Sequence, residues 1–129
     1  MAQEKRRSKT ITQLFTALVL NDVTTSSNSA TINVGDYTDF LLYLDIDSAS
    51  TPTDVQFVVQ FSNDGGTTWF DYKNDFFGDL RYEDTATASR LKECLTGKCG
   101  GRTFRLRAVG AGTTASATFT INAYVEFFK

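Results

Sequence analysis

Hydrophobic and polar residues alternate with a period of two along four segments of the chain, which is the pattern of strands with one buried face. These segments cover residues 40–47, 55–61, 102–109 and 117–127. The last is the most regular, because its odd positions are apolar and its even positions carry Thr, Asn, Tyr and Glu. We expect each segment to turn its apolar residues into a common core.

Shorter segments add to this number of strands. Residues 30–34 and 67–72 have strand-like composition, and residues 80–82 and 88–91 are expected as short strands within long loops. Residues 11–20 fit the face of a helix as well as a strand, and their Thr and Val content favours the strand.

Gly, Asn, Asp, Ser and Pro separate these segments at regular intervals, as turns do. Together they predict an all-β fold: a single-domain antiparallel β-sandwich or jelly roll of about 7–9 strands. No internal repeat has the length that a propeller blade needs. The β-sandwich domain is predicted to cover residues 11–129, after a basic N-terminal arm at residues 1–10.

One stretch, FSNDGGTTWF at residues 61–70, combines an acid, two glycines and the chain's single Trp. Such density is typical either of a ligand site or of a tight hairpin. Two strand-like segments flank it, glycine supplies the positive φ that tight turns need, and an Asp side chain accepts hydrogen bonds from turn amides. We therefore interpret Asp64, Gly65, Gly66 and Trp69 as a structural turn.

Charge is unevenly distributed along the 129 residues. The first ten carry a net charge of +3, from Lys5, Arg6, Arg7 and Lys9 against one acid, and the remainder carries −5. An acidic body argues against nucleic acid as a partner. The arm suits an acidic protein partner, or it is simply a solvated terminus.

The chain has no apolar run of about 18 residues, so no membrane span is predicted. The basic start is followed by a short apolar stretch that Thr16 interrupts, without a small-residue cleavage site. We therefore expect no signal peptide and synthesis in the cytoplasm.

Catalytic and metal-binding groups are scarce. The chain has no His, which removes Ser-His and Cys-His catalysis, and it has no GxSxG or phosphate-loop motif. Cys94 and Cys99 fit either a small-loop disulfide across a turn at Gly97 or two free thiols. We expect no enzyme activity, no cofactor and no metal site.

Aromatic residues are more numerous than one core face can hold. Adjacent residues of a strand point to opposite sides, so Phe76 and Phe77 cannot both point inward, and neither can Phe127 and Phe128. One member of each pair is expected to face solvent or another subunit, with Phe76, Phe77 and Phe128 as candidates. This favours oligomerisation or docking on a partner.

Residues 62–69, SNDGGTTW, resemble the Asp-box, S-x-D-x-G-x-T-W, which occurs in sialidases and many other β proteins. In those families the motif is a hairpin remote from the active site, and sialidases carry several copies of it. The resemblance therefore implies a folded hairpin and does not imply glycosidase activity.

A second resemblance covers most of the chain. The SNDGGTTW hairpin followed by GRTFRLRAVGAGTTASATFTINAYVEFF is similar to small virion proteins of tailed bacteriophages, including capsid decoration (cement) proteins. It implies a viral structural protein on the capsid surface of the virion, assembled as a homotrimer and bound to the major capsid protein. In that setting the arm would hold an acidic neighbouring subunit, and Arg105 and Arg107 would contact carboxylates. Ordinary cross-strand pairing with Asp or Glu is the simpler role for the two arginines.

The alternative function is a carbohydrate- or receptor-binding module of a phage tail or fibre. It predicts an exposed aromatic platform around Trp69 and Tyr72 and an affinity for glycans. The capsid hypothesis instead predicts binding to a capsid lattice, weakened by removal of residues 1–9.

Overall fold

The computed structural model describes residues 11–21, 23–48, 55–72, 80–82, 90–111 and 118–129, and every regular element in these ranges is a strand. The strands are β1 (Thr12–Asn21), β2 (Val23–Asn28), β3 (Ile32–Asn33), β4 (Asp39–Ser48), β5 (Val55–Ser62), β6 (Phe70–Asp71), β7 (Leu80–Tyr82), β8 (Arg90–Lys98), β9 (Thr103–Ala111) and β10 (Thr118–Phe128). The basic arm, Phe76 and Phe77 lie outside the described residues.

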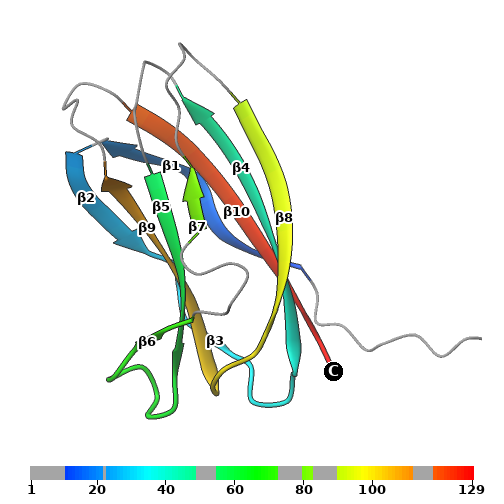
Figure 1. Cartoon of the computed structure of the whole chain (residues 1–129). Helices are drawn as coiled ribbons and strands as arrows, with labels where there is room; N and C mark the ends of the chain where they lie inside the picture. Colours follow the sequence, from blue (N-terminus) through cyan, green and yellow to red (C-terminus); the bar gives the residue numbers. More distant parts are fainter. Residues whose placement is uncertain (1–10, 22, 49–54, 73–79, 83–89, 112–117) are drawn as a thin grey trace, which may run out of the picture.

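Two antiparallel sheets pack face to face (Figure 1). The first, sheet A, has the order β1-β10-β4-β8, and the second, sheet B, has the order β2-β9-β5-β6. Within sheet B, β3 also pairs with β9, and β7 also pairs with β5. These findings confirm the all-β sandwich expected from the alternating segments.

The order of the strands is that of a jelly roll. Because β5 occupies one side of β9, β2 and β3 must share the other side and form one interrupted edge strand. The same argument joins β6 and β7 beside β5. If β2 with β3, and β6 with β7, are each counted as one strand, eight strands result. Numbered along the chain, they have the order 1-8-3-6 in sheet A and 2-7-4-5 in sheet B, so the chain passes from one sheet to the other at most connections.

The core lies between the sheets and is built from the apolar faces that alternation predicts. Inward residues of the four central strands are all buried: Phe40, Leu42, Leu44 and Ile46 in β4; Val55, Phe57, Val59 and Phe61 in β5; Phe104, Leu106 and Ala108 in β9; Ile121, Ala123, Val125 and Phe127 in β10. Phe104 of sheet B meets Phe40 and Phe127 of sheet A, with ring centroids 5.8 and 5.1 Å apart. Aromatic rings therefore join the two layers.

The prediction of a turn at Gly97 was wrong, because β8 continues through this residue. Gly97 lies opposite Phe40 of β4, and a Cβ at Gly97 would approach the Phe40 ring to 2.5 Å. Glycine is required there for close packing, since Phe40 fills the space of a side chain. The residue breaks the apolar alternation of β8, which explains why residues 92–98 were not expected as a strand.

The ambiguous segment at residues 11–20 is a strand, β1, and it carries an irregularity that accounts for its helix-like spacing. Its register with β10 shifts between Gln13 and Leu18, and Ala17 has a φ of 48°. The Ala17 backbone N–H donates to Oδ1 of Asn122 over 2.9 Å. This β-bulge places apolar residues of the segment at intervals other than two.

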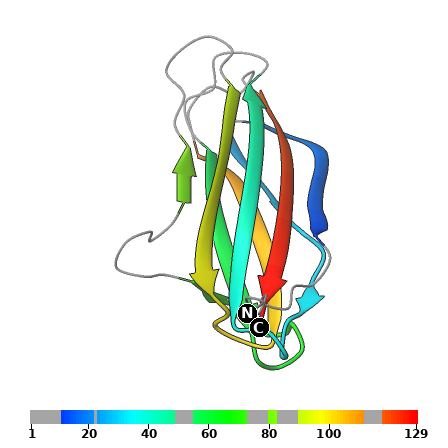
Figure 2. The same ribbon diagram turned by 90° about the vertical axis from the view of Figure 1, so that its right-hand side faces the viewer.

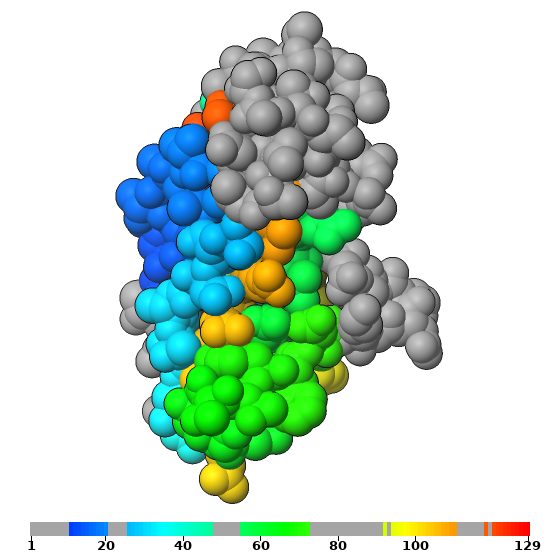
Figure 3. Space-filling model, turned by 90° about the vertical axis from the view of Figure 1, so that its left-hand side faces the viewer, coloured from blue at the N-terminus to red at the C-terminus, as the bar shows by residue number. Residues whose placement is uncertain are grey.

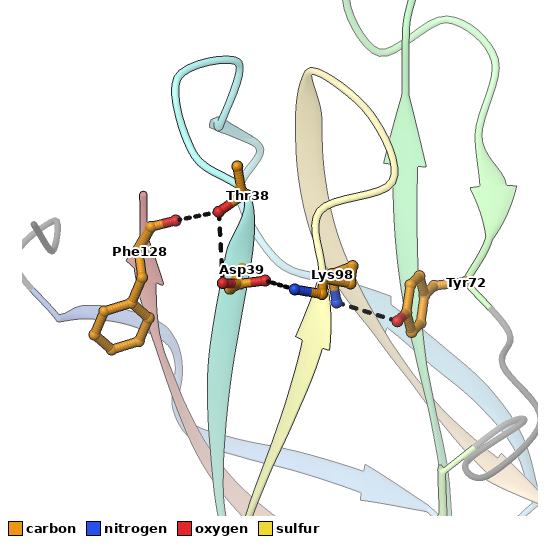
Figure 4. Close-up of polar contacts among 5 residues, drawn as sticks. All are labelled: Thr38, Asp39, Tyr72, Lys98 and Phe128. Atoms are coloured by element: carbon orange, nitrogen blue, oxygen red, sulfur yellow. Dashed lines mark hydrogen bonds and ion pairs between the residues drawn. The ribbon is translucent and has the colours of Figure 1, made fainter. Parts of the chain in front are cut away.

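A polar network ties the strand ends of the two sheets together (Figure 4). The Phe128 carbonyl accepts from the backbone N–H of Thr38 over 2.8 Å, and Lys98 forms an ion pair with Asp39 over 2.8 Å. The Lys98 backbone N–H donates to the hydroxyl of Tyr72, which follows β6 of the other sheet. The network thus fixes β10, β4 and β8 against sheet B at one end of the sandwich.

Replacing Phe104 by alanine tests the role of the aromatic layer. Phe104 is fully buried, so the Phe104→Ala variant should lose about 3–5 kcal/mol of unfolding free energy in urea. Phe70→Ala is the matched control, because Phe70 is 62% exposed and should cost less than about 1 kcal/mol. Equal losses in the two variants would contradict this description of the core.

Candidate functional site

The hairpin between β5 and β6 is organised by two side chains, Ser62 and Asp64. Oδ1 of Asp64 accepts from the Ser62 hydroxyl over 2.7 Å and from the backbone N–H groups of Thr67 and Thr68 over 3.1 and 2.9 Å. The Ser62 hydroxyl in turn accepts from the Gly66 N–H over 2.9 Å. These bonds hold the pKa of the Asp64 carboxyl well below its usual range, and the bond from the Thr68 amide has the largest effect.

Positive φ angles and an indole hydrogen bond complete this turn. Gly65 and Gly66 have φ values of 77° and 98°, a region that disfavours any residue with a Cβ. The Trp69 indole N–H donates to the Gly66 carbonyl over 2.9 Å. The hairpin chemistry therefore determines where the Trp69 ring lies.

Trp69 and Arg105 stack on the outer face of sheet B. The Arg105 guanidinium carbon lies 4.2 Å from the centroid of the Trp69 ring, and its Nε donates to Oε1 of Gln60 over 2.7 Å. Gln60 is 6% exposed, and its Nε2 donates to Oδ1 of Asp71 over 2.7 Å. Arg105, Gln60 and Asp71 form one row across β9, β5 and β6.

Arg107 lies two residues further along β9, in register with Asn28 of β2 and Val58 of β5. Its side chain is half-buried and makes no ion pair or hydrogen bond within the described ranges. Burial and the positive charge of Arg107 lower the pKa of Arg105, against the opposite effect of Asp71. Among the described residues, Arg105 is thus stacked on Trp69 with Asp71 nearby, and neither arginine forms an ion pair with Asp or Glu there.

Tyr72 does not form an exposed platform with Trp69. Its ring packs edge-on against Phe40 and Phe61 of the core, with centroids 5.7 and 5.8 Å away.

Phe128 is half-exposed beside the fully buried Phe127, which is the division expected for adjacent residues of a strand. The face formed by β2, β9, β5 and the hairpin is seen in Figure 3.

A second candidate site, which was not expected from the sequence, lies on the outer face of sheet A, the face turned toward the viewer in Figure 2. It is an open, largely apolar hollow of about 670 Å³, lined by Ile11, Tyr43, Leu44, Asp45, Lys92, Cys94 and Tyr124. Tyr43 lies in register with Tyr124 on one side and Cys94 on the other. The two tyrosines thus stand side by side on the two central strands of the sheet.

Polar groups surround this tyrosine pair. Lys92 and Asp45 form an ion pair over 3.7 Å, and Gln13 Nε2 lies 3.5 Å from the Tyr124 hydroxyl. Burial, followed by the neighbouring charges of Glu126 and Cys94, raises the pKa of Tyr43 above its ordinary value. Tyr43 is therefore a neutral phenol at physiological pH, able both to donate and to accept a hydrogen bond.

Cys94 and Cys99 are free thiols, so of the two states considered from the sequence the structure has the reduced one. Cys94 is exposed in the hollow, whereas Cys99 lies just after β8 and packs against the core. Burial raises the pKa of the Cys99 thiol to about 11.

No group of three or more Cys, Asp or Glu side chains within the described ranges is arranged to hold a metal ion. The same ranges contain no helix long and apolar enough to cross a membrane.

Comparisons with known proteins give structural likenesses only. No protein-family model matches the chain, and no curated protein matches its sequence. Solved structures that resemble it include a family 16 carbohydrate-binding module, with a TM-score of 0.47, 13% identity, and coverage of 80% of this chain and 70% of that one. Another is dimeric latent PorU from Porphyromonas gingivalis, with a TM-score of 0.47 and 7% identity, where 98% of this chain covers 13% of that one. At these scores neither likeness identifies a ligand, and the resemblance to phage virion proteins stays a prediction.

The two thiols should differ in reactivity. The thiolate is the reactive form, and a pKa of about 11 leaves about one Cys99 in a thousand ionised at pH 8. Titration with a chromogenic disulfide at pH 8 should therefore show one fast thiol, which Cys94→Ser removes. The slow Cys99 reaction should accelerate about tenfold per pH unit up to pH 10. A fast phase that survives Cys94→Ser would contradict this assignment.

Proposed function

We propose that the protein is a non-enzymatic binding module that holds a carbohydrate on the outer face of sheet A. The observation that carries the proposal is the hollow around Tyr43 and Tyr124, where two half-buried aromatic rings lie side by side on the two central strands. Sites for small ligands are typically concave and mainly apolar, with a few polar groups that fix orientation.

The chemistry of the hollow suits a sugar. The C–H faces of a pyranose ring pack well against tyrosine rings, and its hydroxyls need donors and acceptors at the rim. Lys92 supplies donors, Asp45 supplies acceptors, and the neutral Tyr43 hydroxyl supplies both. The ligand would lie across β10 and β4, with β8 at its edge.

Several features support a role without catalysis. The whole chain lacks His, the commonest general acid and base. Asp45, the acid that lines the hollow among the described residues, is engaged by Lys92. Cys94 lies there without the His that activates a catalytic thiol.

A polysaccharide screen followed by calorimetry tests the proposal. Tyr43→Ala and Tyr124→Ala should each weaken the best ligand by about fivefold, since aromatic stacking contributes about 1 kcal/mol. Alkylation of Cys94 should also block binding, because the added group would occupy the hollow.

Phe70→Ala is the control, since it removes an exposed aromatic ring from sheet B, and it should leave affinity within about twofold. Two results would contradict the proposal: no binding to any polysaccharide, or binding that depends on Phe70 and not on the tyrosines.

The second candidate function is the virion structural protein expected from the sequence, and exposed apolar residues beside sheet A favour it. Ile11 precedes β1, an edge strand, and is 50% exposed, while Val19 within β1 is 61% exposed. Apolar side chains this exposed on one edge suit contact between subunits. In this candidate the chain assembles as a homotrimer and binds the major capsid protein, with Lys5, Arg6, Arg7 and Lys9 contacting an acidic neighbour.

Light scattering across a concentration series distinguishes the candidates. The structural role predicts a stable trimer that Val19→Asp dissociates, because a charge would be buried at the interface. Thr31→Asp is the control, since it introduces the same charge at an exposed residue just before β3, in the other sheet. A monomer at all concentrations would contradict the trimer.

A further inference from the structure

Two arginines of the same strand, Arg105 and Arg107, lie on the outer face of sheet B. Arg105 and Arg107 are two residues apart on β9, so their Cα atoms lie about 7 Å apart and their side chains share a face. Within the described part of the chain, Arg107 has no hydrogen-bonding or ionic partner. Two like charges on one half-buried face are costly unless an anion accompanies them.

Arg105 is held in a defined orientation before any ligand arrives. Its Nε is bound to the buried Gln60, and its guanidinium lies over Trp69. Its Nη1 and Nη2 make no further hydrogen bond to the described residues, so their donors remain for a partner. Gln60 is in turn oriented by Asp71, and Trp69 by the Gly66 carbonyl. Fixing a guanidinium in advance lowers the entropy lost when it binds a carboxylate.

We propose that Arg105 and Arg107 form a docking surface for an extended acidic peptide segment of a partner protein, separate from the hollow on sheet A. Each guanidinium would bind one carboxylate through two parallel N–H···O bonds. In an extended chain, alternate side chains point the same way at about 7 Å intervals, which matches the spacing of the two arginines. Gln60 and Trp69 are positioning residues in this arrangement.

A peptide fits this surface better than an acidic sugar. One face of the Trp69 ring is covered by Arg105, and the indole N–H at its edge is bound to the Gly66 carbonyl. The face that Arg105 covers is therefore not free to stack on a pyranose, as a sugar site would need. The row Asn28, Arg107 and Val58 beside it belongs to paired strands, whose outward residues recur at the spacing of an extended chain.

Trp69 is the only tryptophan in the chain, so its fluorescence reports directly on this surface. An octapeptide of alternating Glu and Ser should change the emission saturably at low ionic strength, and 0.5 M salt should weaken its binding. Arg107→Gln should weaken binding about tenfold, as expected for a charge-assisted hydrogen-bonded pair. Arg105→Lys keeps the charge but loses the planar fork, and it should also weaken binding when measured by calorimetry.

The matched control is Arg102→Gln, which removes the same charge from an exposed residue just before β9 and should change affinity by less than about twofold. Equal weakening by Arg102→Gln and Arg107→Gln would overturn the proposal, because binding would then be nonspecific attraction. An equal affinity for a control octapeptide of alternating Gln and Ser, which lacks the carboxylates, would also overturn it.

Arg107-dependent binding of polygalacturonate without binding of the peptide would assign the surface to an acidic saccharide instead. Polysaccharide binding at the tyrosine hollow should be unaffected by Arg107→Gln, so the two proposals fail independently.

Discussion

Phenylalanine rings packed between the two sheets hold the sandwich together and determine how its strands align. Phe104 of sheet B meets Phe40 and Phe127 of sheet A, and Phe61 packs beside them, all nearly excluded from solvent. The closeness of these rings leaves no space for a side chain at Gly97. Because the core is closely packed, each strand is fixed in register as well as in position.

This register decides which residues reach the two outer surfaces. A slip of one residue in β4 or β10 would bring Tyr43 or Tyr124 into the core, and a slip in β9 would bury Arg105 and Arg107. The alternation of apolar and polar residues that forms the core therefore also decides which side chains each outer face presents. Sheet A presents tyrosines with carboxylates and lysine, whereas sheet B presents two arginines supported by an amide and an indole ring.

The fold could be predicted from the sequence where alternation is strict. The buried faces of β4, β5 and β9 are those expected from the segments at residues 40–47, 55–61 and 102–109. Strand β8 was mostly missed, because Gly97 resembles a turn residue until its contact with Phe40 is known. The bulge at Ala17 likewise gave β1 the spacing of a helix until the register was known.

The candidate sites could be predicted only in part, since they depend on contacts between distant segments. Tyr43 and Tyr124 both fall on the polar faces of predicted strands, which was the available signal, but their pairing requires the register of β4 and β10. Arg105 and Arg107 were identified from their shared face. The supporting role of Gln60 was not, because an acidic partner across the sheet was the simpler expectation.

We propose that the two outer faces bind different ligands, a carbohydrate on sheet A and an acidic peptide on sheet B. Amide NMR spectra of one labelled sample, titrated first with a polysaccharide and then with the Glu-Ser octapeptide, can separate the two faces. We expect shifts at Tyr43, Tyr124 and Lys92 with the first ligand, and at Arg105, Arg107 and the Trp69 indole with the second. Shifts on the same face with both ligands, or none on either, would contradict it.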